Sequence, residues 1–265
     1  MKVLLINPSF KRKVGKTERV SQVLPPMGLA YLAAILKKEN INVQILDLNA
    51  NGLNKKQILN YIEKYNPEIV GLGAVTTTIN KVWRLSELIK KDFKNINIVL
   101  GGPHPTSLPE ESIKKDSVNF VVVGEGEITF LELIKEFMKK GKKNFRKING
   151  LVFKKRNRIF KNKIRENIED FDSLPFPALE ILPLERYKSA DGKSKKFITI
   201  LTSRGCPGRC NYCNKLTFGY ICRMRSAKNI IEEIEELYAN GYRDFHILDD
   251  LFTNDRKRVV DFCNT

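Results

Sequence analysis

The feature that most constrains the fold is a regular alternation of short apolar runs with helix-period segments over residues 1–142. The runs are rich in Val, Ile and Leu, and they are VLLINP (3–8), VQILDLN (43–49), IVGLGAV (69–75), INIVLGG (96–102) and FVVVGEGE (120–127). Continuous apolar runs of this length are typical of strands buried on both faces, and intervening helices make successive strands parallel. The alternation therefore predicts an open, doubly wound α/β sheet, a Rossmann-like domain.

The pattern changes after residue 142. The segment INGLVFKKRNRIFKNK predicts a β-hairpin that turns at Arg156 and Asn157, and FDSLPFPALEILPLERY indicates a proline-bearing linker over the surface. From Lys196 a strand in FITILTS, a cysteine-rich loop, a helix in SAKNIIEEIEELYANG and a strand in DFHILDD follow, and another helix starts at Asn254. We therefore divide the chain into residues 1–142, 143–195 and 196–265.

Composition narrows the class of protein. The chain is 42% hydrophobic, and the apolar run at its N-terminus, in MKVLLINPSF, is too short for a signal sequence or a membrane span. We therefore expect a cytoplasmic protein with no membrane partner. Its formal net charge of +17 could attract nucleic acid, but the lysines gather in KKEN, KKDF and MKKGKKNFRK, on the predicted outer faces and ends of helices. Nucleic-acid binding is therefore not favoured.

Ligands of an open parallel sheet bind beyond the carboxyl ends of its strands. The loop after the first strand, NPSFKRKVG, lacks the G-x-G-x-x-G fingerprint of NAD or FAD sites. The strand ends instead offer hydroxyls and glycines, which let a large flat ligand approach the backbone, although each loop alone could be a simple turn. The cofactor-binding candidates are Pro8, Thr76, Thr77, Thr78, Gly101, Gly102, Pro103, His104, Gly124, Glu125 and Gly126.

Three segments, PPMGLAYLAA, LGGPHPT and VVVGEGEITFLEL, resemble the cobalamin-binding domain of one large class of radical S-adenosylmethionine enzymes. The resemblance implies a corrinoid across the carboxyl edge of the sheet, with its nucleotide tail beside Thr76–Thr78 and Gly101–Gly102. Domains of the methionine synthase type carry D-x-H-x-x-G after the first strand, but this chain does not. We therefore expect the lower face of the cobalt to be unliganded or met by another group. His104 is one candidate, although a structural role suits it as well.

Three cysteines, Cys206, Cys210 and Cys213, lie close together in TSRGCPGRCNYC. An odd total of five cysteines, three of them clustered, argues for reduced thiols that hold metal rather than for disulfides. Three thiolates cannot complete a structural zinc site, so zinc stays open as an alternative only if Cys222 adds a fourth. Three thiolates can, however, hold an iron–sulfur cluster and leave one iron free for another ligand.

The C-x3-C-x2-C spacing after a strand, with Tyr212 before the last cysteine, resembles the radical S-adenosylmethionine signature. The resemblance implies a [4Fe-4S] cluster on the three cysteines and S-adenosylmethionine on its open iron. It also implies cleavage to a 5′-deoxyadenosyl radical after reduction by a flavodoxin or ferredoxin. We expect Tyr212 to pack over the cluster. Residues 196–265 would begin a radical S-adenosylmethionine barrel that looks truncated, since such a barrel takes about six β/α units.

Asp249 and Asp250 end a predicted strand, where catalytic groups of β/α barrels gather, although turn formation and capping explain them equally well. Ser226 is a candidate N-cap for the next helix. We predict the front portion of a cobalamin-dependent radical S-adenosylmethionine enzyme that moves a methyl group to an unactivated centre of a small-molecule or unknown substrate. The alternatives are a non-catalytic corrinoid- or cluster-binding module and a radical enzyme that has lost cobalamin.

Overall fold

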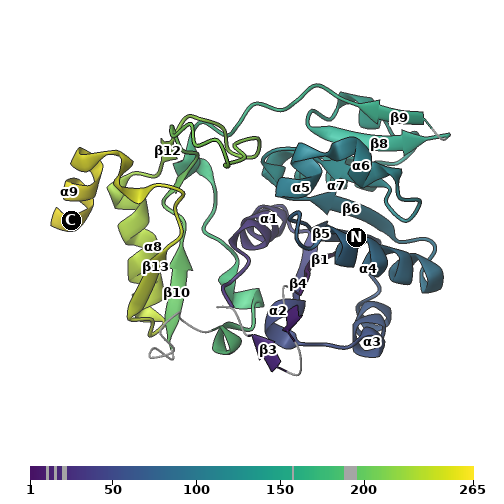
Figure 1. The fold of residues 1–265 in the computed structure, drawn as a ribbon, viewed down its shortest axis with the longest axis horizontal. Coiled ribbons are helices and arrows are strands. Elements are labelled where there is room, and N and C mark those ends of the chain that lie inside the picture. The colour runs from purple at the N-terminus through teal and green to yellow at the C-terminus, as the bar shows by residue number, and fades with distance from the viewer. Residues whose placement is uncertain (10–11, 15–16, 20–22, 157, 188–195) are drawn as a thin grey trace.

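The structure is a computed structural model that describes residues 1–265 except 10–11, 15–16, 20–22, 157 and 188–195. Within the described residues, one sheet has its strands in the order β4-β1-β5-β6-β7-β8-β9 (Figure 1). The parallel members are β1 (Lys2–Asn7), β4 (Asn42–Asp47), β5 (Ile69–Gly73), β6 (Asn97–Gly101) and β7 (Phe120–Val122). These strands lie in the apolar runs of the sequence, which confirms the doubly wound α/β fold.

Alternate residues of each strand feed two hydrophobic cores, one on each face of the sheet. Val3 and Leu5 of β1 pack in the core that contains α1 and α7, whereas Leu4 and Ile6 pack in the core that contains α3, α4 and α6. The helices are α1 (Met27–Lys38), α2 (Leu48–Asn51), α3 (Lys55–Tyr65), α4 (Ile79–Asp92), α5 (Pro103–Ser107), α6 (Pro109–Lys114) and α7 (Gly126–Met138). With both faces covered, the carboxyl edge of the sheet is left for a site.

The predicted hairpin is present, as β8 (Leu151–Lys155) paired antiparallel with β9 (Arg158–Lys161). Arg156 in its turn has a φ of 47°, and Asn157 lies outside the described residues. The hairpin extends the main sheet, because β8 also pairs antiparallel with β7. Apolar burial explains why β8 lies beside β7. Phe153 of β8 is 3% exposed, and its ring centroid lies 5.3 Å from that of Phe160 on β9. A short antiparallel pair β2 (Arg12–Val14) and β3 (Thr17–Arg19) follows β1.

The linker between the two halves packs closely against the first half. Its short 3-10 turns are η2 (Phe171–Ser173), η3 (Leu179–Ile181) and η4 (Leu184–Arg186), and η1 (Phe145–Lys147) precedes the hairpin. The backbone N–H of Ala178 donates to the carbonyl of Ala30 on α1, at 3.1 Å. Tyr187 is buried, and its hydroxyl donates to Asp47 Oδ2 at 3.0 Å. The linker is therefore fixed to α1 and to the end of β4.

The second half repeats the β/α pattern. It contains β10 (Phe197–Ile200), α8 (Ala227–Ala239) and β13 (Asp244–Ile247), followed by η5 (Phe252–Asn254) and α9 (Arg256–Asn264). Strands β10 and β13 are parallel, and β11 (Ser203–Arg204) pairs antiparallel with β12 (Arg223–Met224). Ser226 caps α8 as predicted, because its hydroxyl accepts from the Asn229 backbone N–H at 3.2 Å. Buried residues of β10 share one core with α1, so the halves are joined by apolar packing.

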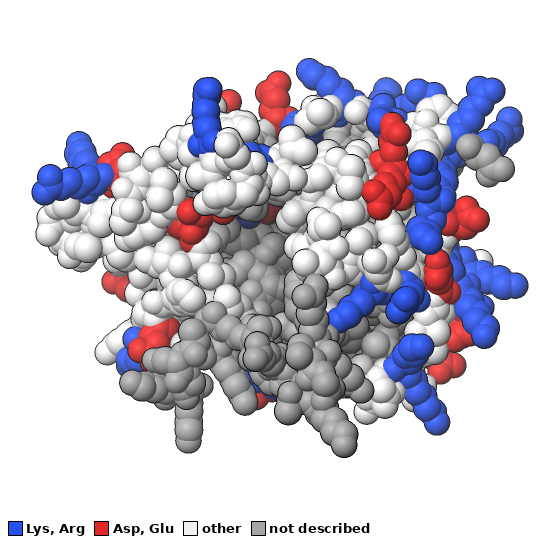
Figure 2. Space-filling view, in the orientation of Figure 1, with Lys and Arg blue, Asp and Glu red and all other residues white. Residues whose placement is uncertain are grey.

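Positive charge lies on outer faces of the first half. Figure 2 shows Lys and Arg side chains gathered along the right-hand edge of one face, where Figure 1 places α3, α4 and the β8–β9 hairpin. This arrangement agrees with the predicted outer positions of the lysines. Among the helices of the described residues, none has the length and apolarity needed to cross a membrane.

Candidate functional site

A cavity of about 390 Å³ opens at the carboxyl edge of the sheet, and we call it the sheet-edge cavity. Strand order reverses between β1 and β5, because the chain passes from β1 to β4 on one side and then to β5 on the other. Residues of both strands line the cavity, which therefore lies at the topological switch point where doubly wound sheets bind ligands. Its walls also include Leu201, Arg204, Phe218 and Leu248 of the second half.

Glycines form part of the lining of the sheet-edge cavity. Gly102 has a φ of 102°, and a Cβ built there would lie 2.8 Å from the carbonyl oxygen of Ala74. A Cβ on Gly28 or on Gly124 would instead meet nothing within 4 Å, so it would project into open space. Backbone is thus exposed where a side chain would otherwise stand. This glycine cradle fits a bulky, flat ligand such as a corrinoid.

The three clustered cysteines lie on one loop, which leaves β11 after Arg204 and returns to β12 at Arg223. Cys206 is partly buried, and Cys210 and Cys213 are exposed. A second hollow of about 470 Å³, the cysteine pocket, is lined by Gly208, Arg209, Cys210, Asn211, Cys213, Lys215 and Tyr220. The loop therefore presents thiols together with two cationic side chains.

The thiols are near one another without forming a ready ligand set. A Cβ built on Gly208 would lie 3.4 Å from the sulfur of Cys206 and 3.7 Å from that of Cys210, and the Lys215 ammonium contacts the sulfurs of Cys206 and Cys213. Among the described residues, however, no three His, Cys, Asp or Glu side chains are grouped closely enough to hold a metal ion. The three thiols have the chemistry that an iron–sulfur cluster needs, and cluster binding by them stays a prediction.

Cys222 stands apart from this pocket. Its thiol lies against the hydroxyl of Ser203, and burial raises its pKa. Metals bind the thiolate, so a thiol with a raised pKa is a poorer metal ligand than one with an ordinary pKa. The arrangement gives no support to a four-cysteine zinc site.

Comparison with known proteins shows what the chain is similar to. Residues 16–134 match the B12 binding domain. Over 268 residues the chain is 37% identical to an uncharacterised methyltransferase of Pyrococcus horikoshii, covering 98% of this chain and 56% of that relative. The fold matches that of OxsB, a cobalamin-dependent S-adenosylmethionine radical enzyme solved with aqua-cobalamin and S-adenosylmethionine. The TM-score is 0.80 at 22% sequence identity, and the match covers 99% of this chain and 36% of OxsB. The chain thus carries a match to the B12 binding domain and shares its fold with a cobalamin-dependent S-adenosylmethionine radical enzyme.

The curated relatives of the chain carry different names for their reactions. The chain is also 31% identical over 272 residues to the anaerobic magnesium-protoporphyrin IX monomethyl ester cyclase of Rubrivivax gelatinosus, covering 99% of this chain and 47% of that relative. It thus spans about half the length of the curated relatives it matches. The comparisons therefore leave the reaction itself open.

The loops that we predicted to contact cobalamin divide into two groups. Six predicted residues line the sheet-edge cavity: Gly101, Gly102, Pro103, Gly124, Glu125 and Gly126. Outside the lining are Pro8 and Thr78, both buried, and Thr76 and Thr77, both exposed. The Thr78 hydroxyl accepts from the Val75 backbone N–H at 3.1 Å, which fixes the turn before α4. The contacts of all these residues with a cofactor stay predictions.

His104 also lies outside the lining of the cavity, although it is only 3% exposed. Its Nδ1 is 3.3 Å from the hydroxyl of Thr76, and its ring packs edge-on against Trp83 at 6.2 Å. These contacts give it a structural role in the loop after β6. His246, on β13, is exposed. Tyr212 is 92% exposed, so its packing over a cluster stays a prediction.

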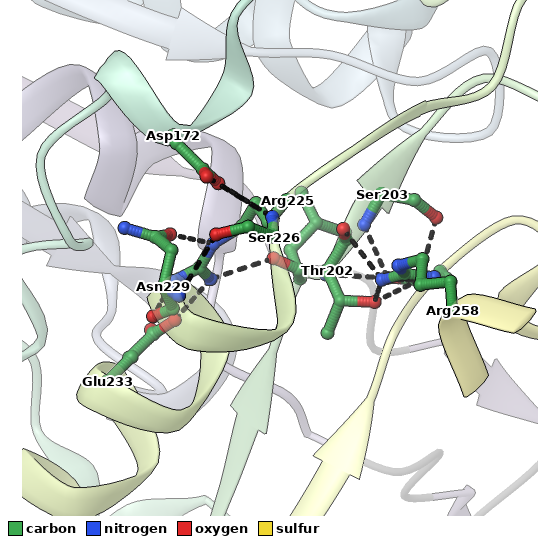
Figure 3. Close-up of polar contacts among 10 residues, drawn as sticks. Asp172, Thr202, Ser203, Arg225, Ser226, Asn229, Glu233 and Arg258 are labelled. Atoms are coloured by element: carbon green, nitrogen blue, oxygen red, sulfur yellow. Dashed lines mark hydrogen bonds and ion pairs between the residues drawn. The ribbon is translucent and has the colours of Figure 1, made fainter. Parts of the chain in front are cut away.

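Asp249, which we predicted to be catalytic, holds the start of the cysteine loop. Its Oδ1 accepts from the backbone N–H groups of Thr202 (2.7 Å) and Ser203 (3.0 Å), and its Oδ2 accepts from both hydroxyls. Arg258 donates to the Thr202 carbonyl at 3.0 Å and braces the same turn (Figure 3). With both oxygens occupied and its side chain fully buried, Asp249 suits a positioning role better than a catalytic one. Asp250 is exposed.

Sequence reasoning missed a buried ion cluster that joins the two halves. Arg204 Nη1 lies 3.3 Å from Glu125 Oε1, Arg204 Nη2 lies 2.7 Å from Glu127 Oε1, and Arg223 Nη1 lies 2.8 Å from Glu125 Oε2. All four side chains are at most 10% exposed, so each charge needs its partner. The available signal was the GEGE sequence, since two carboxylates at the end of a buried strand require cations.

The Arg204 guanidinium also lies against aromatic rings. The rings of Tyr31, Phe171 and Phe218 have their centroids 5.1, 4.7 and 5.4 Å from its central carbon. These contacts come from α1, from the linker and from the cysteine loop, so three separate segments meet at one cation. Burial raises the pKa of Tyr31, which keeps its phenol neutral within this cluster. Arg204 is therefore a structural centre between the two halves.

Proposed function

We propose that this chain carries the cobalamin and cluster sites of a radical S-adenosylmethionine enzyme that transfers a methyl group to an unactivated centre. The observation that carries the proposal is the shared wall of the sheet-edge cavity. Its lining combines the strand-end loops of the B12 binding domain with Leu201, Arg204 and Phe218, which flank or belong to the cysteine loop. A corrinoid in the cavity would therefore lie next to a cluster held by that loop.

The residues divide into two binding sets. Gly101, Gly102, Gly124 and Gly126 would hold the corrinoid by exposing backbone, and the apolar side chains around them would exclude water. Cys206, Cys210 and Cys213 would hold a [4Fe-4S] cluster with S-adenosylmethionine on its free iron. When bound, the cluster supplies the electron that splits S-adenosylmethionine, and cobalamin supplies the methyl carrier. The buried Arg204 and Asp249 would hold the cysteine loop in a fixed position next to the sheet-edge cavity.

Methyl transfer is favoured over ring closure by the name of the Pyrococcus relative, a methyltransferase, which is more similar to this chain than the Rubrivivax cyclase. The substrate is proposed to be a small molecule. Reduction is assigned to a flavodoxin or ferredoxin, since the cationic Arg209 and Lys215 at the cysteine pocket suit an acidic donor.

Anaerobic reconstitution with iron and sulfide tests the cluster site. We expect sulfide-to-iron charge-transfer absorbance in the wild-type chain and its loss in Cys206→Ala, Cys210→Ala and Cys213→Ala. Cys263→Ala is the matched control, because Cys263 is an exposed cysteine outside the loop, and it should retain the absorbance. A chain that stays colourless, or that keeps the absorbance without Cys210, contradicts the proposal.

Two further assays separate an enzyme from a carrier. Titration with hydroxocobalamin should give saturable binding, and reduction in the presence of S-adenosylmethionine should release 5′-deoxyadenosine. Saturable binding without any 5′-deoxyadenosine would favour a non-catalytic corrinoid- or cluster-binding module. Release of 5′-deoxyadenosine without cobalamin binding would favour a radical enzyme that has lost cobalamin.

A further inference from the structure

The neck of the cysteine loop is the short β11–β12 pair, and its two arginines meet one carboxylate. Arg204 and Arg223 are register partners across the pair, and residues 205–222 lie between them. Glu125 contacts both, with Oε1 3.3 Å from Arg204 and Oε2 2.8 Å from Arg223. The carboxylate therefore closes the base of the loop that carries all three clustered cysteines.

Glu125 belongs at the same time to the wall of the sheet-edge cavity. It stands between Gly124 and Gly126, which also line the cavity. Gly124 has a φ of 79°, so the backbone turns sharply just before the carboxylate, and α7 begins directly after it. A ligand that presses on this turn would therefore restrain Glu125 directly.

The charges in the neck are balanced. Glu125, Glu127, Arg204 and Arg223 contribute two negative and two positive charges, and the side chains of Glu125 and Arg204 are only 2% and 3% exposed. Burial of this kind leaves ion pairs little screened by solvent and gives them defined geometry. Glu125 Oε2 also accepts from the Ile168 backbone N–H at 2.7 Å, which ties the linker to the same point.

We propose that Glu125 couples the two sites: a corrinoid bound against Gly124–Gly126 restrains Glu125, and Glu125 restrains the neck and the spacing of the cysteines. This inference rests on the proposed function, because it takes cobalamin as the ligand of the sheet-edge cavity. Glu125 is a positioning residue in this scheme. Coupling of this kind is reciprocal, so an ordered cysteine loop would also favour cobalamin binding.

Hydrogen–deuterium exchange of the whole chain, with and without cyanocobalamin, tests the coupling. Cobalamin should slow exchange in the loops around residues 101–104 and 124–126, and also by about 5-fold or more in peptides covering 203–224. The neck variant Glu125→Gln/Arg223→Gln removes one charge of each sign and should lose only the slowing at 203–224. The matched control is Arg225→Gln/Glu233→Gln, which removes the buried pair between Arg225, just before α8, and Glu233 in the middle of α8, and it should behave as wild type.

Direct contact of cobalamin with Leu201, Arg204 or Phe218 could also slow exchange, and the neck variant distinguishes the two causes. If slowing at 203–224 persists in that variant, or is absent in wild type while 101–104 and 124–126 are protected, the coupling is refuted and the cobalamin site stands. If cobalamin protects none of these segments, the proposed cobalamin site fails and the coupling with it. Should the neck variant not fold, Glu125→Asp keeps the charge, shortens the reach to both arginines, and should show the same selective loss.

Discussion

Replacement of Asp249 decides whether this carboxylate shapes the cysteine loop or takes part in the chemistry. In the structure it accepts hydrogen bonds from two backbone N–H groups and two hydroxyls of Thr202 and Ser203. The hydroxyls can rotate toward other partners, but the two N–H groups cannot. A positioning role therefore predicts a loss of stability that depends on whether the new side chain can still accept these bonds.

The size of the effect follows from the donors left unpaired. A buried donor without a partner costs about 1–3 kcal/mol, so Asp249→Ala should lower the free energy of unfolding by about 2–6 kcal/mol. Asp249→Asn keeps one carbonyl oxygen for the two N–H groups and offers an amide to the two hydroxyls. It loses only the extra strength of bonds to a charged acceptor and should cost about 1–2 kcal/mol.

Urea unfolding followed by far-ultraviolet circular dichroism measures both values, and iron content after reconstitution reports on the loop. Asp249→Ala should bind much less iron than wild type, and Asp249→Asn should bind nearly as much. The reasoning is refuted if Asp249→Ala is as stable as wild type. It is refuted equally if Asp249→Asn keeps its stability and iron but releases no 5′-deoxyadenosine, because that result assigns the carboxylate to the chemistry.

Three further predictions follow from single residues. Gly102→Ala should lose about 1–3 kcal/mol of stability in urea unfolding and bind hydroxocobalamin more weakly, since its φ of 102° suits glycine and the new Cβ would lie 2.8 Å from the Ala74 carbonyl oxygen. Gly205→Ala should lower iron content after reconstitution, because its Cβ would lie 2.2 Å from the Ile221 carbonyl oxygen; full iron loading would contradict this. Burial raises the pKa of Asp47 above its ordinary value of 3.8, so the folded state binds this proton more tightly than the unfolded state does. Wild-type stability therefore falls as pH rises from the ordinary pKa through the raised one. Asp47→Asn lacks this loss, so its stability relative to wild type should increase between pH 4 and pH 7 in urea unfolding, and a constant difference would be against the argument.

Local sequence was sufficient for the fold of the first half. Runs such as VLLINP and INIVLGG are apolar at successive positions, in VLLI and IVL, because β1 and β6 are buried on both faces, and that pattern distinguishes parallel from antiparallel strands. The glycines after β6 and β7 could likewise be placed at the carboxyl edge, because every parallel strand ends there. The cysteine loop was evident from its spacing alone.

Contacts between distant segments could not be predicted in this way. Glu125 meets Arg204 and Arg223 across 79 and 98 residues, and nothing in the local sequence of either segment specifies the other. Asp249 was predicted to be catalytic because it ends a strand, whereas its position beside Thr202 depends on the parallel pairing of β10 and β13. The β8–β9 hairpin was predicted correctly, but its attachment to β7 depends on the packing of Phe153 and its aromatic neighbours.

Mössbauer spectroscopy of the chain reconstituted with ⁵⁷Fe tests the central claim most directly. If three thiolates hold a [4Fe-4S] cluster with one open iron, the signal of a single iron should change when S-adenosylmethionine is added, and the signals of the others should not. A spectrum that does not respond to S-adenosylmethionine, or metal analysis that finds zinc in place of iron, would contradict the account.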